Sequence, residues 1–290
     1  MTVLVTGASG TIGRPLLTRL SGEGVPVRAV VHRRDSATAL SEQALPGVEV
    51  IATDLADAAA TAELMDGVEA VFLATGNVDT QLAQEQSVIA AAAAAGVRRL
   101  VKVSVGGASE DAPLTLARVH YAAEQALAAS GLTYTILRPA FFMDNLLQYI
   151  PWIEPSGLLR LPLGDGAVGM IDARDIADVA AYELHNPVSD NLDLSVTGPE
   201  DLTAAQALAA ISEVVGRPLS YSDTTGEEFL RRYTSDGNPA DYARDITLLY
   251  DTIVRAGYAA GTTDVVQQIT GNPGRTIVDF AQHHRAAFTR

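Results

Sequence analysis

The stretch VLVTGASGTIG, residues 3–13, decides the fold of this chain. It begins with apolar residues typical of a buried strand, continues through three glycines, and is followed at residues 15–20 by the apolar spacing of a helix. A strand, a glycine-rich turn and a helix in this order are typical of a site for a dinucleotide diphosphate. The alternative is an ordinary tight turn between a strand and a helix.

Each of the three glycines has a use in such a site. Gly7 permits a tight turn off the strand, Gly10 lets a pyrophosphate approach the backbone, and Gly13 lets the helix lie close to the sheet. The free N–H groups at the start of the helix, with the positive end of its dipole, then face the diphosphate.

Composition excludes several classes of protein. The 290 residues carry a net charge of −15, which argues against a nucleic-acid or membrane surface as partner and favours a small-molecule substrate. The chain has no cysteine, so thiol catalysis and cysteine-ligated zinc are excluded, and its five histidines lack a metal-binding spacing. No apolar run reaches membrane-spanning length, and we expect a soluble cytoplasmic protein. A homodimer is left open.

Strands and helices alternate along the first half of the chain. This alternation predicts a doubly wound parallel sheet with its ligands at the carboxyl ends of the strands. We expect a dinucleotide-binding domain over residues 1–150, to which 167–196 contribute, and a smaller, mainly helical lobe over residues 151–290 that covers the strand ends. Strands are predicted at residues 25–31, 48–53, 69–74, 99–103, 133–137 and 191–196, and the later helices at 173–184, 204–215, 227–233, 242–256 and 276–288.

Arginines follow the second predicted strand. Arginine at this point accommodates a 2′-phosphate, whereas an acidic residue would hold a ribose hydroxyl, and no Asp or Glu stands at the strand tip. The sequence therefore favours NADP(H) over NAD(H). Arg33 is the first candidate for the phosphate contact and Arg34 the second, with His32 also left open; the alternative is a solvated basic loop.

Other candidate residues stand where later strands end, namely Asp54, Thr75, Gly76 and Ser104. Asp54 is placed to accept a hydrogen bond from the adenine amino group, or else it caps the following helix. After the sixth strand comes an aromatic group that lines a substrate cavity or forms the seam between two lobes: Phe141, Phe142, Tyr149 and Trp152.

With these features in view, the sequence resembles the NmrA-like, atypical short-chain dehydrogenase/reductase family, most closely its NADPH-dependent quinone reductase type. The resemblance rests on the glycine loop, Asp54-Leu55, Ser104, HYAAEQAL at 120–127, SGLTYTILRP at 130–139, Asn145-Leu146, residues 172–181 and TGPE at 197–200. It implies a Rossmann domain with a smaller C-terminal lobe. It also implies a cofactor site: Gly7, Ser9, Gly10, Thr11, Ile12 and Gly13 at the diphosphate, Arg33 at the 2′-phosphate, Asp54 and Leu55 at the adenine, Thr75 and Gly76 near the ribose, and Phe141 near the nicotinamide.

The sequence departs from ordinary short-chain dehydrogenases at their Tyr and Lys pair, which lies one helical turn apart. Aligned through Glu124 and Leu127, the lysine position holds His120 and the tyrosine position holds Leu116. Tyr121 is turned about 100° from that face. Histidine at the lysine position is what the quinone-reductase type shows. His120 then contacts a ribose hydroxyl or donates a proton; the alternative is a core histidine satisfied by backbone groups.

The missing tyrosine favours a particular class of acceptor. Hydride addition to a quinone spreads charge over a conjugated ring, so a weak acid suffices, whereas a simple ketone requires an immediate proton donor. We therefore expect an NADPH-dependent oxidoreductase acting on quinones or related acceptors, with His120 and Ser104 as the catalytic candidates. Ser104 alternatively closes its strand with a local hydrogen bond. The rival functions are a non-catalytic NADP(H)-sensing regulator acting through a protein partner and, third, a sugar epimerase.

Overall fold

A computed structural model describes residues 1–76, 78–185 and 190–289 of the chain. The backbone divides into two compact units. The first unit comprises Met1–Arg138 and Ile176–Ser195, and the second comprises Pro139–Asp175 and Val196–Arg290. Because the chain leaves the first unit and returns to it, neither unit is a single continuous segment.

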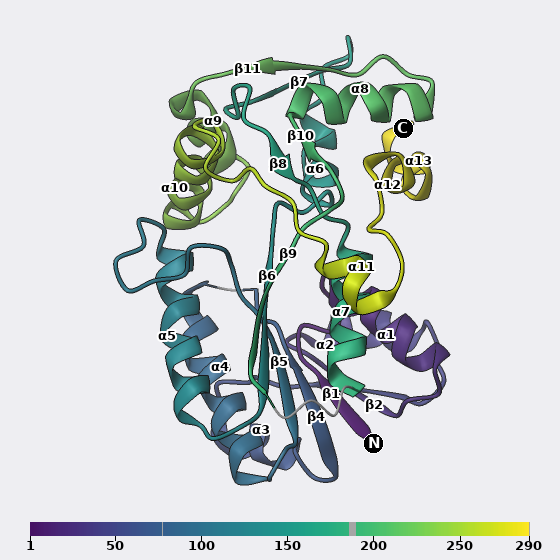
Figure 1. Ribbon diagram of the computed structural model, residues 1–290, viewed down its shortest axis with the longest axis vertical. Coiled ribbons are helices and arrows are strands. Elements are labelled where there is room, and N and C mark those ends of the chain that lie inside the picture. Colours follow the sequence, from purple (N-terminus) through teal and green to yellow (C-terminus); the bar gives the residue numbers. More distant parts are fainter. Residues whose placement is uncertain (77, 186–189, 290) are drawn as a thin grey trace. The chain divides into compact units, whose positions relative to one another are not determined.

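A seven-stranded sheet forms the centre of the first unit, in the order β3-β2-β1-β4-β5-β6-β9 (Figure 1). The pairs β1–β2, β1–β4, β2–β3, β4–β5 and β5–β6 are all parallel, which confirms the predicted doubly wound sheet. Its strands are β1 (Thr2–Val5), β2 (Val27–Val31), β3 (Val48–Ala52), β4 (Val68–Leu73), β5 (Arg99–Val103), β6 (Tyr134–Pro139) and β9 (Leu192–Val196).

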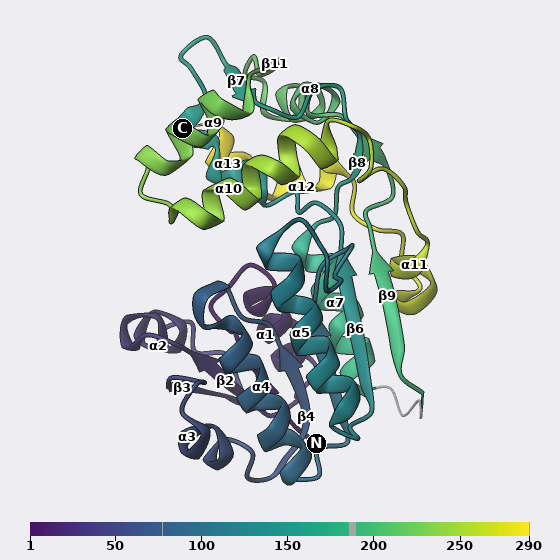
Figure 2. The same ribbon diagram turned by 90° about the vertical axis from the view of Figure 1, so that its left-hand side faces the viewer.

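Helices cover both faces of this sheet, and Figure 2 shows α4 and α5 side by side on one of them. The order of the strands reverses beside β1, which is where such folds bind their ligands. The helices are α1 (Gly13–Gly22), α2 (Arg34–Ser41), α3 (Ala58–Glu63), α4 (Val78–Ala94), α5 (Thr115–Ala129) and α7 (Ala173–His185), the last of which begins in the second unit.

The core of the first unit lies between the sheet and its helices. Leu4, Val71 and Leu100 of the strands are fully buried with Val88 of α4 and Leu127 of α5. Each such side chain contributes roughly 1.5–3 kcal/mol when buried. The central strand β1 reads as a continuous apolar run over Val3–Val5 because both of its faces are covered.

The second unit combines short strand pairs with helices. The strand β10 (Asp201–Leu202) pairs antiparallel with β8 (Val168–Gly169), and β11 (Ser220–Asp223) pairs parallel with β7 (Leu158–Leu161). Around them lie α6 (Asn145–Gln148), η1 (Ile150–Trp152), α8 (Ala204–Val215), α9 (Gly226–Ser235), α10 (Ala240–Leu248), η2 (Leu249–Val254), α11 (Val265–Thr270), α12 (Ile277–His283) and α13 (Arg285–Phe288).

Helix boundaries agree best with the prediction where a cap is present. Thr203 forms a capping box at the start of α8, and Gly216 ends that helix in the left-handed conformation, as expected for residues 204–215. The predicted helix over 242–256 is instead α10 followed by the π-helical segment η2. The helix expected over 276–288 is interrupted at His284.

The helix α2 was not predicted. Leu40 is its one fully buried residue, so its sequence lacks the apolar repeat by which amphipathic helices are recognised. Within the described residues, no helix is both long and apolar enough to cross a membrane.

Candidate functional site

The glycine turn that follows β1 is sterically closed to larger residues. Gly7 has φ +57°, and a Cβ atom there would lie 2.7 Å from the carbonyl oxygen of Ala74. A Cβ atom on Gly13 would lie only 2.2 Å from the carbonyl oxygen of Gly7. Both positions therefore require glycine, and Gly13 brings α1 against the turn as predicted.

The fully described start of α1 carries no side-chain cap. Its N-cap residue, Ile12, makes no side-chain capping bond, and no acidic residue stands in the first turn of this fully described helix. Gly10 and Thr11 are exposed beside it. Arg14 donates from Nε to the carbonyl oxygen of Ser9 over 2.8 Å, which holds a cation next to the turn. Sequence reasoning missed Arg14, although its place in the first turn after a glycine loop was a signal.

The two arginines that follow β2 lie at the N-terminal end of α2. Arg33 is the N-cap residue of this helix and Arg34 is its first residue. The Arg33 side chain is 70% exposed, and its Nη2 lies 3.7 Å from Oδ2 of the exposed Asp35. An exposed pair at this distance is weak, so the guanidinium remains available to a phosphate. His32 is also exposed.

Asp54 does not cap α3. Its Oδ1 accepts from the backbone N–H of Ala56, whereas Asp57 accepts from the N–H groups of Ala59 and Ala60 as the N-cap residue. The capping interpretation of Asp54 was therefore wrong, because the turn places the helix start three residues later. Asp54 is exposed, while Leu55 lies in the core of the first unit.

A buried polar network lies below the ends of β4 and β5. Thr75 donates from Oγ1 to Oε1 of Glu85 over 2.9 Å, and Gln81 donates to the same oxygen over 3.1 Å. The other oxygen, Oε2, is 2.6 Å from Nζ of Lys102, and both side chains of this ion pair are fully buried. Lys102 also donates to the carbonyl oxygen of Val103 over 3.0 Å.

His120 of α5 joins this network. Its Nδ1 lies 3.1 Å from Nζ of Lys102, and Nε2 of Gln81 is 3.3 Å from Nδ1 and 3.2 Å from Nε2. Burial, with the charges of Lys102 and Arg138, lowers the pKa of His120 to about 3. The imidazole is therefore neutral at neutral pH. His120 is buried, as the interpretation of a core histidine predicted, but the partners found for it are side chains and not the expected backbone groups.

Sequence reasoning missed Gln81, Glu85 and Lys102. A lysine inside a strand covered on both faces was a signal, since lysine is almost never fully buried without a partner. Gln81 and Glu85 are four residues apart and thus share one face of α4. Nothing in the linear sequence pairs that face with β5 and α5.

Ser104, the second catalytic candidate, is 2% exposed and donates from Oγ to Oε1 of Glu124. Glu124 also accepts from Arg138 at 2.9 Å, and Arg138 reaches Asp193 at 2.7 Å. The expected local hydrogen bond was wrong, because the partner is on α5 and twenty residues away. The hydroxyl hydrogen of Ser104 is thus committed to a carboxylate.

The aromatic group after β6 belongs to the second unit. Phe141 lies with its ring centroid 5.6 Å from that of Tyr250, and Tyr149 donates to the hydroxyl of Tyr250 over 3.1 Å. Tyr149 and Trp152 are 1% and 6% exposed and contribute to the core of this unit. Tyr149 and Trp152 therefore lie in the interior of this unit, while Phe141 and Phe142 are half-buried.

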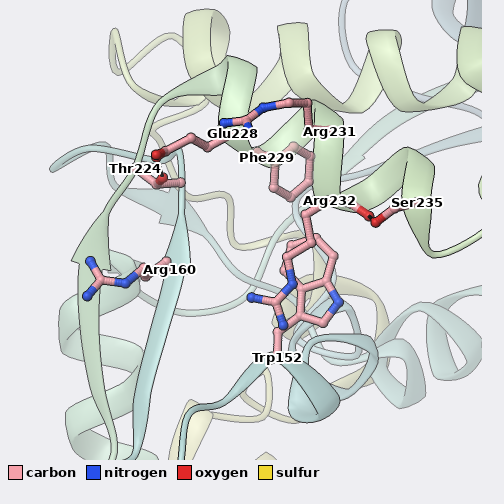
Figure 3. Close-up of a pocket in the computed structure, with 8 residues that line it drawn as sticks. All are labelled: Trp152, Arg160, Thr224, Glu228, Phe229, Arg231, Arg232 and Ser235. Carbon is pink, nitrogen blue, oxygen red and sulfur yellow. Dashed lines mark hydrogen bonds between the residues drawn. The ribbon is translucent and has the colours of Figure 1, made fainter.

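The second unit also carries a surface pocket of about 520 Å³ (Figure 3). Arg232 lies over the ring of Trp152 at 4.2 Å, and Nε1 of Trp152 donates to Asp236 over 2.6 Å. Of the aromatic residues singled out in the sequence, Trp152 lines it, whereas the predicted catalytic and cofactor-binding residues are not among its lining residues. The lining residues are Trp152, Arg160, Thr224, Glu228, Phe229, Arg231, Arg232 and Ser235.

Comparison with known proteins gives consistent results. The model of the NmrA-like family matches residues 1–269. The chain is 38% identical over 286 residues to an NAD(P)H azoreductase of Xenophilus azovorans, covering 99% of both sequences. It is 37% identical over 287 residues to a (4-alkanoyl-5-oxo-2,5-dihydrofuran-3-yl)methyl phosphate reductase of Streptomyces griseus, again covering 99% of both.

A solved structure agrees with these sequences. The NADPH-dependent quinone oxidoreductase of Escherichia coli, complexed with NADPH, superposes with a TM-score of 0.83 at 27% identity. The alignment covers 97% of this chain and 99% of that one. The likeness therefore extends over both units and not only over the glycine turn.

Proposed function

The chain belongs to the NmrA-like family and is an NAD(P)H-dependent oxidoreductase, and on this premise we propose that its hydride acceptor is a quinone or a similar conjugated compound. The observation that carries the proposal is the neutral, buried His120 at the position where ordinary short-chain dehydrogenases have lysine. Such a site offers a weak acid and no tyrosine at Leu116. It suits acceptors whose negative charge is delocalised after hydride addition.

The names of the relatives support this class of acceptor. An azo group, a quinone and a dihydrofuranone whose ring double bond is conjugated with carbonyl groups each accept hydride into a delocalised π system. Isolated alcohols and ketones have no such system. We therefore propose that this chain, too, reduces a conjugated C=C, N=N or quinone group.

We propose NADP(H) as the preferred cofactor. The closed glycine turn and the uncapped start of α1 fit a diphosphate, and the exposed Arg33 fits a 2′-phosphate. When bound, the reduced nicotinamide supplies the hydride. The proposed contacts are Gly7, Ser9, Gly10, Thr11, Ile12 and Gly13 to the diphosphate, Arg33 and then Arg34 to the 2′-phosphate, Asp54 and Leu55 to the adenine, Thr75 and Gly76 to the ribose, and Phe141 to the nicotinamide.

His120 is the proposed catalytic residue. Because an ammonium group only donates, the contact with Lys102 makes Nδ1 the acceptor and places the ring hydrogen on Nε2. Gln81, whose amide nitrogen lies 3.3 Å from Nδ1 and 3.2 Å from Nε2, is then a second donor to Nδ1. From Nε2 the neutral ring donates to a ribose hydroxyl or to the reduced acceptor. Ser104 has the lesser role, since its hydrogen already goes to Glu124.

The test is oxidation of NADPH, followed by absorbance, with the purified chain and matched panels of quinones, azo dyes, dihydrofuranones and simple ketones. We expect oxidation with the conjugated panels and none above background with the ketones. His120→Ala should slow it. Equal rates with ketones would contradict the proposed acceptor class, and tight NADPH binding without oxidation by any acceptor would favour the regulator instead.

A further inference from the structure

A fully buried ion pair next to the proposed catalytic histidine requires an explanation. Lys102 and Glu85 are both 0% exposed, and their contact is 2.6 Å. Removing two charges from water costs several kcal/mol per ion, and a well-packed apolar pair is often as stable. Stability alone is therefore a weak explanation of this pair. Its lysine also contacts His120, which gives the pair a second use.

The geometry orders these groups in a chain of donors. Glu85 accepts hydrogen bonds from Thr75 and Gln81 on Oε1, and its Oε2 forms an ion pair with Lys102, so three groups hold its carboxylate in place. Lys102, held by that carboxylate and by the carbonyl oxygen of Val103, directs Nζ to Nδ1 of His120. The lysine reaches the histidine from β5, whereas the histidine itself is on α5.

We propose that Lys102, positioned by Glu85, sets the tautomer of His120 and supplies it with the proton that the reduced acceptor consumes. This inference rests on the proposed function. It makes Lys102 a positioning residue that acts through His120, and it gives this chain a substitute for the usual tyrosine acid.

In the proposed step, hydride transfer to the acceptor is followed by proton transfer through the imidazole ring. Hydride from the reduced cofactor forms a C–H or N–H bond on the acceptor and leaves a negative charge on its oxygen, carbon or nitrogen. That atom takes the hydrogen of Nε2, while Nδ1 takes a proton from Nζ, so His120 remains neutral throughout. Lys102 becomes an amine. After the product leaves, Nε2 takes a proton from water and Nδ1 returns its proton to Nζ, which restores both groups.

The surrounding charges support a neutral histidine. Lys102 faces it from β5 and Gln81 from α4, Glu85 pairs with Lys102 behind them, and the charge of Arg138 acts on it from β6, where Arg138 pairs with Glu124 of α5. Burial, and then the charges of Lys102 and Arg138, lower the pKa of His120. A second proton on the ring is therefore disfavoured, and transfer through the ring does not require one.

The first test needs no substrate. In the complete chain, ¹⁵N and ¹H NMR of the histidines should show one His120 tautomer with the hydrogen on Nε2 at pH 7. In Lys102→Met the pKa of His120 should rise by at least one unit and the single tautomer should be lost. An unchanged pKa and tautomer would overturn the proposal, whether or not the chain reduces any acceptor.

The second test measures turnover with the best conjugated acceptor. Lys102→Met should lower kcat at least tenfold, change the KM for NADPH less than threefold, and enlarge the solvent deuterium isotope effect on kcat. Glu85→Gln, which keeps the shape of the side chain, should show the same pattern in a milder form. If Lys102→Met does not fold, Glu85→Gln tests the proposal in its place.

A matched control is the ion pair between Arg99, which is on the same strand as Lys102, and Glu183 of α7; their side chains are 4% and 2% exposed. Arg99→Met should destabilise the chain comparably and leave kcat and the isotope effect within twofold of the parent. If it lowers kcat as much as Lys102→Met does, the effect of Lys102 is structural and the relay is refuted. If the parent reduces no acceptor, the proposed function fails while the NMR result still stands.

Discussion

The Cβ position of Gly13 lies 2.2 Å from the carbonyl oxygen of Gly7, a separation at which no side chain fits without movement of the backbone. The two glycines thus hold the turn after β1 and the start of α1 against each other. Gly10 differs, because a Cβ atom there would lie 3.0 Å from the same oxygen and the residue is exposed.

Gly13→Ala should therefore destabilise the first unit and weaken NADPH binding at least about tenfold, or on the order of 1.4 kcal/mol. Gly10→Ala should change the melting temperature little. It should weaken NADPH binding only because the added methyl group hinders the approach of the diphosphate. Fluorescence titration with NADPH and thermal unfolding of both variants test this. Parent-like binding by Gly13→Ala would refute the predicted diphosphate site.

Arg33→Ala should weaken NADPH binding by about 1.5–3 kcal/mol, the worth of a hydrogen bond to a charged group, and leave NADH binding almost unchanged. Arg14 provides the contrast, since it lies beside the glycine turn. Arg14→Ala should weaken both cofactors equally. Titration of each variant with NADPH and with NADH gives the ratio of the two affinities. An equal loss of affinity for both cofactors in Arg33→Ala would exclude a 2′-phosphate contact there.

His120 should make the stability of the chain depend on pH. Its pKa is lowered to about 3 in the folded chain, from an ordinary value near 6.5, so the unfolded chain binds the proton first as the pH falls. The stability that the neutral ring contributes is present above pH 6.5 and is lost progressively down to pH 3. Between pH 7 and pH 5 the loss is about 2 kcal/mol.

Urea unfolding of the parent and of His120→Asn at both pH values isolates this effect. The comparison with a variant is needed because burial raises the pKa values of Asp144 and Asp175 to about 6, and those carboxyls act in the opposite direction over the same range. The parent should lose about 2 kcal/mol relative to the variant. A constant difference between the two proteins would mean that His120 titrates normally.

Ser104→Ala should cost about 1 kcal/mol of stability, because Glu124 loses one donor and keeps Arg138. Since the Ser104 hydroxyl is engaged inside the first unit, its loss should reduce kcat less than His120→Ala does. Steady-state kinetics and urea unfolding of both variants check this. A larger fall in kcat with Ser104→Ala would make the serine the principal catalytic residue.

The doubly wound sheet, the glycine turn and the caps of α8 could be predicted from the sequence alone, because each depends on residues close together in the chain. A glycine is needed wherever the backbone turns or approaches closely, a threonine caps the helix it precedes, and apolar runs predict strands. His120 was found through the resemblance to short-chain dehydrogenases, by alignment of their lysine position through Glu124 and Leu127.

The surroundings of His120 were decided by the tertiary structure. Gln81 and Glu85 reach it from α4 and Lys102 from β5, and only the register of the sheet and the rotation of two helices determine that these side chains meet. Likewise, the turn after β3 made Asp57 the cap of α3, and packing took Tyr149 and Trp152 into the core of the second unit. Contacts between distant segments depend on side-chain orientation across the fold, and local sequence patterns carry no record of it.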